Sequence, residues 1–320
     1  MRTTRLLAIG LVILTVGSFA DLFRHEFINY DDPAYVTAND FVKGGLTSGG
    51  VHWAFTTYTA ANWHPLTWLS MMLDAELFGA DSARGFLFTN LLFHVGSVLL
   101  LFGSLRSATG RVWCSAFVTA VFAIHPLRVE SVAWVSERKD VLSIFFGMLT
   151  LRLYVSFVQR RRPLPYLLMT LSYLVGMFAK QTLVTLPFVL LLMDYWPFGR
   201  LSREVDSGVG GAQASSVRGL PWRRMFALTI EKLPLFVISG VFCVVAAHAQ
   251  KEGDAVADLL AVPMLMRVYN AIYSYVAYLG MMFWPVNLSL IYPHPEYRIP
   301  TSWLVGSGMF LVGMTILVVA

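Results

Sequence analysis

The amino-acid sequence predicts an all-α polytopic membrane protein, and its composition is the first reason. Of the 320 residues, 57% are hydrophobic and only 13% are charged, whereas soluble domains carry about a quarter of charged residues. Long apolar runs recur along the chain, and a helix needs about 20 apolar residues to cross the hydrocarbon core. These runs are too long for the strands of a β-barrel. They must therefore form helices, in which the backbone N–H and C=O groups are hydrogen-bonded within the segment.

Nine apolar runs are expected to form membrane-spanning helices. The first is expected to be an uncleaved helix rather than a signal peptide, because its apolar stretch continues to Phe23 and further spans follow. We expect a fragment, or a module of a longer protein, because the chain stops at Ala320 inside an apolar run. The expected spans cover residues 5–23, 86–105, 112–127, 140–158, 165–180, 182–196, 233–249, 268–284 and 302–320.

The distribution of Lys and Arg predicts an N-terminus on the cytoplasmic side of the membrane. Segments expected on that side are rich in Arg, including a cytoplasmic linker at 197–232 whose 203–219 stretch is rich in Gly, Ser and Ala. The long segment 24–84 is mainly acidic and is expected to be the first outer loop. The net charge of +5 therefore reflects membrane topology, since no basic stretch is long enough to follow nucleic-acid phosphates.

The first outer loop is rich in aromatic residues, including Trp53, Trp63 and Trp68. The stretch 64–73 predicts a juxtamembrane helix lying on the bilayer, with Pro65 at its start. Composition alone favours an aromatic belt that needs no ligand. The alternative is a platform that holds a lipid substrate at the outer leaflet.

Two adjacent carboxylates, Asp31 and Asp32, lie in this loop shortly after the first span. Mutual repulsion raises one of the two pKa values, and a carboxylate held near a low-dielectric boundary can act as a general base. The pair could equally bind a divalent cation through its oxygens. The Asp-Asp-Pro pattern by itself favours a third interpretation, a turn or a helix cap.

Basic residues near the outer ends of later spans are candidate phosphate ligands. Arg138 and Lys139 stand at the mouth of the fourth span, and residues 128–140 are expected to form one helix. Lys180 lies between two short spans, and Arg267 is expected at the outer interface. The alternative is that these side chains are solvated or snorkelling anchors at helix ends.

Several motifs together resemble one family of membrane enzymes. They are Phe27-Ile28-Asn29-Tyr30-Asp31-Asp32, Asn62-Trp63-His64-Pro65-Leu66-Thr67, Thr89-Asn90-Leu91-Leu92-Phe93-His94, His125-Pro126 with Glu137-Arg138-Lys139-Asp140, and Asp194-Tyr195-Trp196-Pro197. On these motifs the chain resembles the transmembrane and tetratricopeptide-repeat family and its bacterial relatives. These are protein O-mannosyltransferase-like glycosyltransferases of the GT-C fold, which use polyprenyl-phosphate-linked sugars. The resemblance covers most of residues 1–320 as one transmembrane module. The tetratricopeptide repeats that usually follow in the family are expected but lie outside this sequence.

The resemblance implies an inverting transfer of a sugar, with mannose as the candidate, to a hydroxyl of a protein Ser or Thr or of a glycan. Asp31 is then the expected base, and Asp32 orients the acceptor or helps to hold a divalent metal, which is possible but not required. The expected donor-phosphate ligands are Arg138, Lys139, Lys180 and Arg267. The expected orienting residues are Glu137, Asp140, His64 and His125. The sugar, the number of donor phosphates and the acceptor stay open.

Two other functions are compatible with a helical membrane bundle. A lipid or solute transporter, or flippase, usually has ionisable residues near the bilayer midplane or broken helices in repeated halves. A non-catalytic membrane anchor of a repeat scaffold needs neither. Both rank lower because they leave the acidic pair without a purpose.

Overall fold

The computed structural model describes residues 2–201, 222–255, 262–289, 292 and 300–319, and within these ranges every regular element is a helix. This confirms the predicted all-α fold class. The longer helices are α1 (Arg2–Ser18), α4 (Pro65–Phe78), α5 (Ala83–Thr109), α6 (Val112–Ile124), α8 (Arg138–Arg160), α9 (Pro163–Ala179), α12 (Leu233–Glu252), α13 (Met264–Phe283) and α14 (Thr301–Val319). The shorter ones are η1 (Ala20–Arg24), η2 (Pro33–Thr37), α2 (Asp40–Lys43), α3 (Ser48–Thr56), η3 (Thr59–Ala61), η4 (Pro126–Arg128), α7 (Val129–Ala133), η5 (Val135–Glu137), η6 (Gln181–Thr185), α10 (Leu186–Tyr195) and α11 (Trp222–Glu231).

The chain is a multi-pass membrane protein. Among the described residues, four helical segments are long and apolar enough to cross a bilayer, and a fifth is added if a pair bent by 56° counts as one span. The four are Arg2–Arg24, Ala83–Thr109, Val135–Arg160 and Leu233–Glu252, and the bent pair is Val112–Ile124 with Pro126–Ala133. The other expected spans also coincide with helices, α9, α10, α13 and α14. The total of nine spans stays a prediction.

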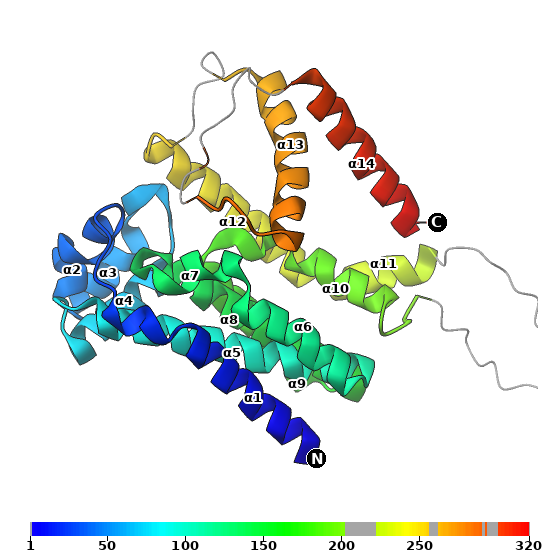
Figure 1. Ribbon diagram of the computed structural model, residues 1–320, viewed down its shortest axis with the longest axis horizontal. Coiled ribbons are helices and arrows are strands. Elements are labelled where there is room, and N and C mark those ends of the chain that lie inside the picture. Colours follow the sequence, from blue (N-terminus) through cyan, green and yellow to red (C-terminus); the bar gives the residue numbers. More distant parts are fainter. Residues whose placement is uncertain (1, 202–221, 256–261, 290–291, 293–299, 320) are drawn as a thin grey trace, which may run out of the picture.

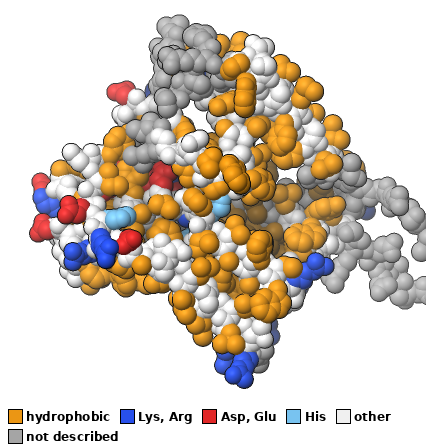
Figure 2. Space-filling view, viewed as in Figure 1, with side chains coloured by type: hydrophobic (Ala, Val, Ile, Leu, Met, Phe, Trp, Pro, Cys, Tyr) orange, Lys and Arg blue, Asp and Glu red, His pale blue; other side chains and the backbone are white. Residues whose placement is uncertain are grey.

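Helices α5, α8 and α9 form the centre of the bundle (Figure 1). Both α5 and α9 pack along α8, while α1 and α6 pack against each other and against α5. Helix α12 packs against α9 and η6, and α13 pairs with α14. Apolar side chains cover much of the face in Figure 2, and charged side chains gather at the end formed by the first-loop helices and at the start of α1. This distribution suits a bundle surrounded by lipid.

Two glycines allow α8, α9 and η6 to approach closely. A Cβ atom on Gly176 would lie 2.6 Å from a methyl of Leu183, and one on Gly147 would lie 2.8 Å from the other methyl. Small residues at helix contacts in membranes permit such close backbone approach. The contact brings the α9–η6 junction against the first turns of α8, where Ser143 Oγ donates to the Lys180 carbonyl at 3.4 Å.

The segment 24–84 folds into a lobe at one end of the bundle, where α2, α3 and α4 pack against one another (Figure 1). Its core contains Tyr35, Trp68, Met71 and Met72, all at most 1% exposed. The helix expected at 64–73 is confirmed as α4, and Pro65 is its first residue. Because Trp68, Met71 and Met72 are buried, one face of α4 forms the core of the lobe.

The single helix expected over residues 128–140 is wrong. Trp134 has an extended backbone (φ −119°, ψ 126°), and this residue separates α7 from η5 and α8. Two side chains from elsewhere stabilise the break. The Asn90 amide donates to the Val132 and Trp134 carbonyls at 3.3 and 3.0 Å, and the Ser136 N–H donates to Asp32. Tertiary hydrogen bonds therefore replace the helical ladder at this point.

Part of the expected linker at 197–232 is structured. Residues Trp222–Glu231 form α11, and Arg200 and Lys232 are buried between helices. The Gly- and Ser-rich stretch 203–219 lies outside the described residues.

Candidate active site

The two adjacent carboxylates have different environments. The Asp32 side chain is fully buried, and its two oxygens accept hydrogen bonds from the backbone N–H groups of Ile28 at 2.8 Å and Ser136 at 3.0 Å. Burial raises the pKa of Asp32, while these N–H donors oppose the shift. Asp32 thus connects the first loop to the segment before α8. Asp31 is half-buried, and no hydrogen bond or ion pair to its carboxylate is found among the residues that the structure describes.

An ionic cluster lies beside the acidic pair at the start of α8. Lys139 Nζ is 2.8 Å from Glu137 Oε1, and Glu137 Oε2 is 3.4 Å from Lys180 Nζ. Lys180 Nζ also lies 2.5 Å from Asp140 Oδ1. We call Tyr35, His64, Glu137, Lys139, Asp140 and Lys180 the first-loop cluster. Within it Lys180 is the more accessible cation, with 26% of its side chain exposed against 9% for Lys139.

Tyr35 joins the ionic cluster to an aromatic stack. The Lys139 ammonium lies 4.7 Å from the centre of the Tyr35 ring and donates to its hydroxyl at 3.3 Å. Burial raises the pKa of Tyr35, and the charge of Asp31 adds to that shift. His64 stacks on Tyr35 with ring centres 5.6 Å apart and lies 4.8 Å from Trp68.

His64 is neutral at physiological pH. Burial lowers the pKa of His64 to about 3, and the charges of Lys139 and Lys180 contribute to that shift. Its Nε2 atom is buried and has no hydrogen-bond partner within the described part of the chain. A buried polar atom without a partner is unfavourable unless a ligand or water meets it.

Arg138, unlike Lys180, has no exposed side-chain surface. Its side chain is fully buried and donates to Asn90 Oδ1 and Ser70 Oγ, and one Nη atom donates to both Asp74 Oδ2 and the Phe86 carbonyl, all between 2.5 and 2.7 Å. Four of its five N–H groups are used within the protein. Arg138 therefore connects α4, α5 and α8, and its guanidinium is not accessible to a ligand.

Two other candidates lie outside the first-loop cluster. His125 accepts from the Leu127 N–H at 3.2 Å through Nδ1, and its Nε2 lies 2.9 Å from the Met282 carbonyl. Its two ring nitrogens thus connect η4 to α13. Arg267 lies near the start of α13, where its Nε donates to the Val262 carbonyl at 3.0 Å.

Among the residues that it describes, the structure contains no preformed metal-binding site. No group of three or more His, Cys, Asp or Glu side chains there is arranged to hold an ion. Asp32 accepts two backbone N–H groups, so Asp31 is the more available of the two carboxylates for any ligand.

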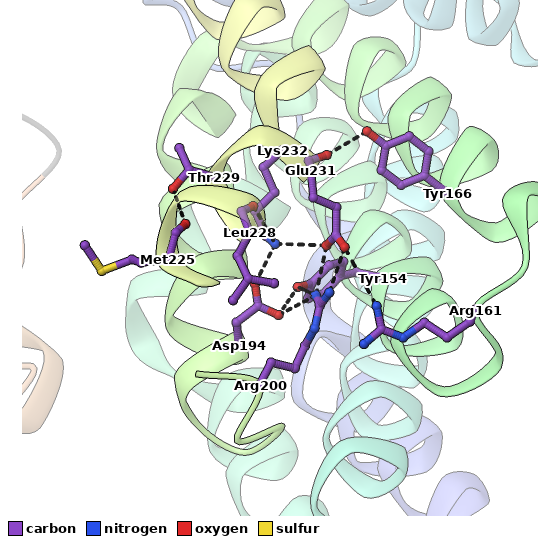
Figure 3. Close-up of polar contacts among 10 residues, drawn as sticks. All are labelled: Tyr154, Arg161, Tyr166, Asp194, Arg200, Met225, Leu228, Thr229, Glu231 and Lys232. Carbon is purple, nitrogen blue, oxygen red and sulfur yellow. Dashed lines mark hydrogen bonds and ion pairs between the residues drawn. The ribbon is translucent and has the colours of Figure 1, made fainter. Parts of the chain in front are cut away.

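A second ionic cluster, at the other end of α8, was not predicted from the sequence (Figure 3). Asp194 and Lys232 are both fully buried, and Lys232 Nζ lies 2.5 Å from Asp194 Oδ2. Arg200 Nη1 lies 2.7 Å from the other Asp194 oxygen, which also accepts a short hydrogen bond from Tyr154. Arg200 Nη2 lies 2.7 Å from Glu231. We call Tyr154, Asp194, Arg200, Glu231 and Lys232 the Asp194 cluster.

A signal for the Asp194 cluster is present in the sequence. Asp194 stands in an apolar segment, and Glu231 and Lys232 immediately precede an apolar span. A charge beside an apolar run is costly unless it has a partner, so opposite charges on two such runs suggest a pair. From the sequence, Asp194 was instead interpreted as part of a motif, and residues 231 and 232 as linker.

Three curated proteins are similar to this chain in sequence. Tmtc2 of Drosophila melanogaster is 28% identical over 201 residues, 55% of this chain and 20% of that protein. Tmtc1 of the same organism is 24% identical over 278 residues, 84% of this chain and 31% of that protein. Human TMTC4 is 30% identical over 162 residues, 43% of this chain and 22% of that protein.

All three relatives are named protein O-mannosyl-transferases. These similarities support the resemblance to that family. The chain spans between about a fifth and a third of the length of these relatives. No protein-family model matches the chain, and no solved structure matches it.

Proposed function

We propose that this chain is the membrane-embedded catalytic part of a glycosyltransferase that moves a sugar from a polyprenyl-phosphate donor to a hydroxyl acceptor. The observation that carries the proposal is the half-buried Asp31, whose carboxylate has no hydrogen bond or ion pair among the described residues and whose charge acts on Tyr35 of the first-loop cluster. The sequence relatives add support, since each is named a protein O-mannosyl-transferase. Mannose is the proposed sugar and a protein Ser or Thr the proposed acceptor. The proposed location is an inner membrane, with Asp31 on the periplasmic face.

Asp31 is the proposed general base and Asp32 its support. A base must reach the proton that it removes, and Asp31 is the accessible carboxylate of the two. Asp32 is fully buried and accepts two backbone N–H groups, one of them from a residue 104 positions away. It therefore fixes the backbone that carries Asp31 against the segment before α8.

The proposed phosphate ligands are Lys180 first and Lys139 second. Negative charge grows on the leaving phosphate as the bond to the sugar breaks, and preorganised cations stabilise that charge. Both ammonium groups lie beside Glu137, and Lys180 also lies beside Asp140. These carboxylates hold the cations in position and favour their charged forms. His64 is buried and stacks on Tyr35, and it is proposed to orient that ring beside the Lys139 ammonium.

The proposed reaction inverts the anomeric centre. Asp31 would take the proton of the acceptor hydroxyl, and the acceptor oxygen would form a bond to the anomeric carbon. The bond from that carbon to the phosphate oxygen would break on the opposite face, so that polyprenyl phosphate leaves with the electron pair. An oxocarbenium-like transition state is expected, as in other glycosyl transfers.

The test is sugar transfer by the purified full chain in lipid nanodiscs. The donors are polyprenyl phosphates that carry mannose or other hexoses, and the acceptors are Ser- and Thr-containing peptides. Asp31→Asn should reduce transfer at least about a hundredfold, on the order of a general base's contribution, without changing thermal stability. The matched control is Asp40→Asn, because Asp40 lies in the same loop and its side chain is 95% exposed. That control should retain full activity.

The Asp32→Asn variant tests whether Asp32 supports the backbone around Asp31 rather than taking part in the reaction. One carboxylate oxygen becomes an NH₂ group that faces a backbone N–H, so the variant should lose roughly 1–3 kcal/mol of stability as well as activity. Transfer by Asp31→Asn at the wild-type rate would remove Asp31 as the base. An Asp32→Asn variant as stable as wild type would contradict its supporting role.

A further inference from the structure

A small basic pocket lies beside the Asp194 cluster, at the end of α8 opposite the first-loop cluster. Its volume is about 210 Å³, and it is lined by Arg161, Arg200, Arg224, Ala227 and Leu228. From Lys139 to Arg161 is 22 residues, which at 1.5 Å per helical residue is roughly 33 Å along α8. That length is about the thickness of a bilayer core, so the pocket lies near the opposite membrane surface. It takes no part in the proposed transfer reaction.

Arginines are in excess over carboxylates around this pocket. Two buried or half-buried acids, Asp194 and Glu231, pair with two buried cations, Arg200 and Lys232. Arg161 approaches Glu231 only to 3.8 Å and is 53% exposed. Arg224 has no hydrogen bond or ion pair among the described residues. Arg161 and Arg224 therefore bring positive charge that the described part of the protein does not balance.

The helix that carries Arg224 has the pattern of a membrane-surface helix. Three large apolar side chains of α11, Trp222, Phe226 and Ile230, follow one another at intervals of four residues and are 72%, 68% and 51% exposed. Side chains four residues apart share one face of a helix. An exposed apolar face with arginines beside it is typical of a helix lying in the headgroup region.

We propose that this pocket binds the phosphate of an anionic phospholipid headgroup. Arginine presents planar, paired donors that match phosphate oxygens, and basic pockets between membrane helices bind anionic headgroups. Arg161 and Arg224 make the direct contacts. Arg200 is held in place by Asp194 and Glu231, with 7% of its side chain exposed, and it forms the charged floor of the pocket. The apolar face of α11 lies along the acyl chains of the same leaflet.

Binding to the purified full chain in a neutral detergent tests this proposal. The probes are phosphatidylglycerol, phosphatidylcholine and inorganic phosphate, and the readout is the number of lipids retained by native mass spectrometry together with the shift in melting temperature. The Arg161→Gln/Arg224→Gln double variant should bind phosphatidylglycerol at least about tenfold more weakly. The control is Arg160→Gln, because Arg160 is an exposed neighbour in sequence and does not line the pocket. The Arg161→Lys/Arg224→Lys double variant keeps the charge and should retain part of the affinity.

The outcomes distinguish the possible sources of the phosphate. Preference for phosphatidylglycerol that is lost only in the double Gln variant supports the proposal. Inorganic phosphate that binds as tightly as the lipid would overturn the lipid assignment. Equal retention of phosphatidylcholine and phosphatidylglycerol, or unchanged lipid binding by the double Gln variant, would remove the pocket as an anion site. None of these outcomes depends on sugar transfer.

Discussion

Replacement of Arg138 by Met should destabilise the protein severely. Asp74 would remain as a buried carboxylate, 3% exposed, without the guanidinium that lies 2.6 Å from it. Breaking one partner of a buried ion pair costs about 3–5 kcal/mol. Asn90 Oδ1 and the Phe86 carbonyl would each lose a donor as well. We therefore expect a loss of about 4 kcal/mol or more, a large part of a typical stability of about 5–15 kcal/mol.

Thermal unfolding of the wild type and of Arg138→Met measures this loss. We expect the melting temperature to fall by roughly 10 °C. A second variant, Arg138→Met/Asp74→Leu, removes both charges and should recover much of the loss, because buried pairs are replaceable by apolar residues of similar volume. Thr89 keeps a partner in that double variant, since its hydroxyl also donates to the Gly85 carbonyl at 3.2 Å.

The matched control is Arg84→Met, because Arg84 is an exposed arginine near the start of α5. It should leave the melting temperature unchanged. The contrary outcome is an Arg138→Met variant that keeps the wild-type melting temperature but requires a much higher donor concentration for sugar transfer. In that case Arg138 binds the donor phosphate, and its assignment as a buried structural residue is wrong.

Two further predictions concern buried ionisable groups. Because the folded pKa of His64 is about 3 and the ordinary value is 6.5, the unfolded state binds the proton first as the pH falls, and stability is lost from about pH 6.5 down toward 3. By about pH 5 the protein should have lost about 2 kcal/mol of unfolding free energy. The measurement compares the pH dependence of stability in the wild type and in His64→Phe. Parallel pH profiles of stability for the two proteins would contradict a lowered pKa of His64. Lys232→Met should destabilise the fold by about 3 kcal/mol because it removes one of the two cations that neutralise the buried Asp194. Lys251→Met, at an exposed position of α12, should melt like the wild type, and an equally unaffected Lys232→Met would show that the buried pair is not formed.

Local features of the fold were predictable from the sequence. Apolar runs located the helices because backbone groups in lipid leave the chain few alternatives. Pro65 located the start of α4 because proline fits the first turn of a helix. In both cases the controlling interaction is within the segment itself.

The break at Trp134 was not predictable in the same way. Asn90 and Asp32 supply hydrogen bonds to the segment 132–136 from 42 to 104 residues away. Local sequence in that segment is compatible with a helix, and only tertiary partners favour the extended residue. The same reason hid the role of Arg138, because its four partners lie 48 to 68 residues before it.

The resemblance led us to expect Asp31 as the base, but the sequence contains no physical reason to prefer it over Asp32. Two identical neighbours have the same intrinsic acidity, so only their surroundings can assign them different roles. Asp32 is fully buried and accepts hydrogen bonds from two backbone N–H groups. It could approach an acceptor hydroxyl only by breaking the hydrogen bonds that connect the first loop to the segment before α8. Asp31 shares the backbone that Asp32 fixes but keeps its own oxygens available. If one of this pair is the general base, Asp31 is the better placed of the two, and its position depends on the hydrogen bonds of Asp32.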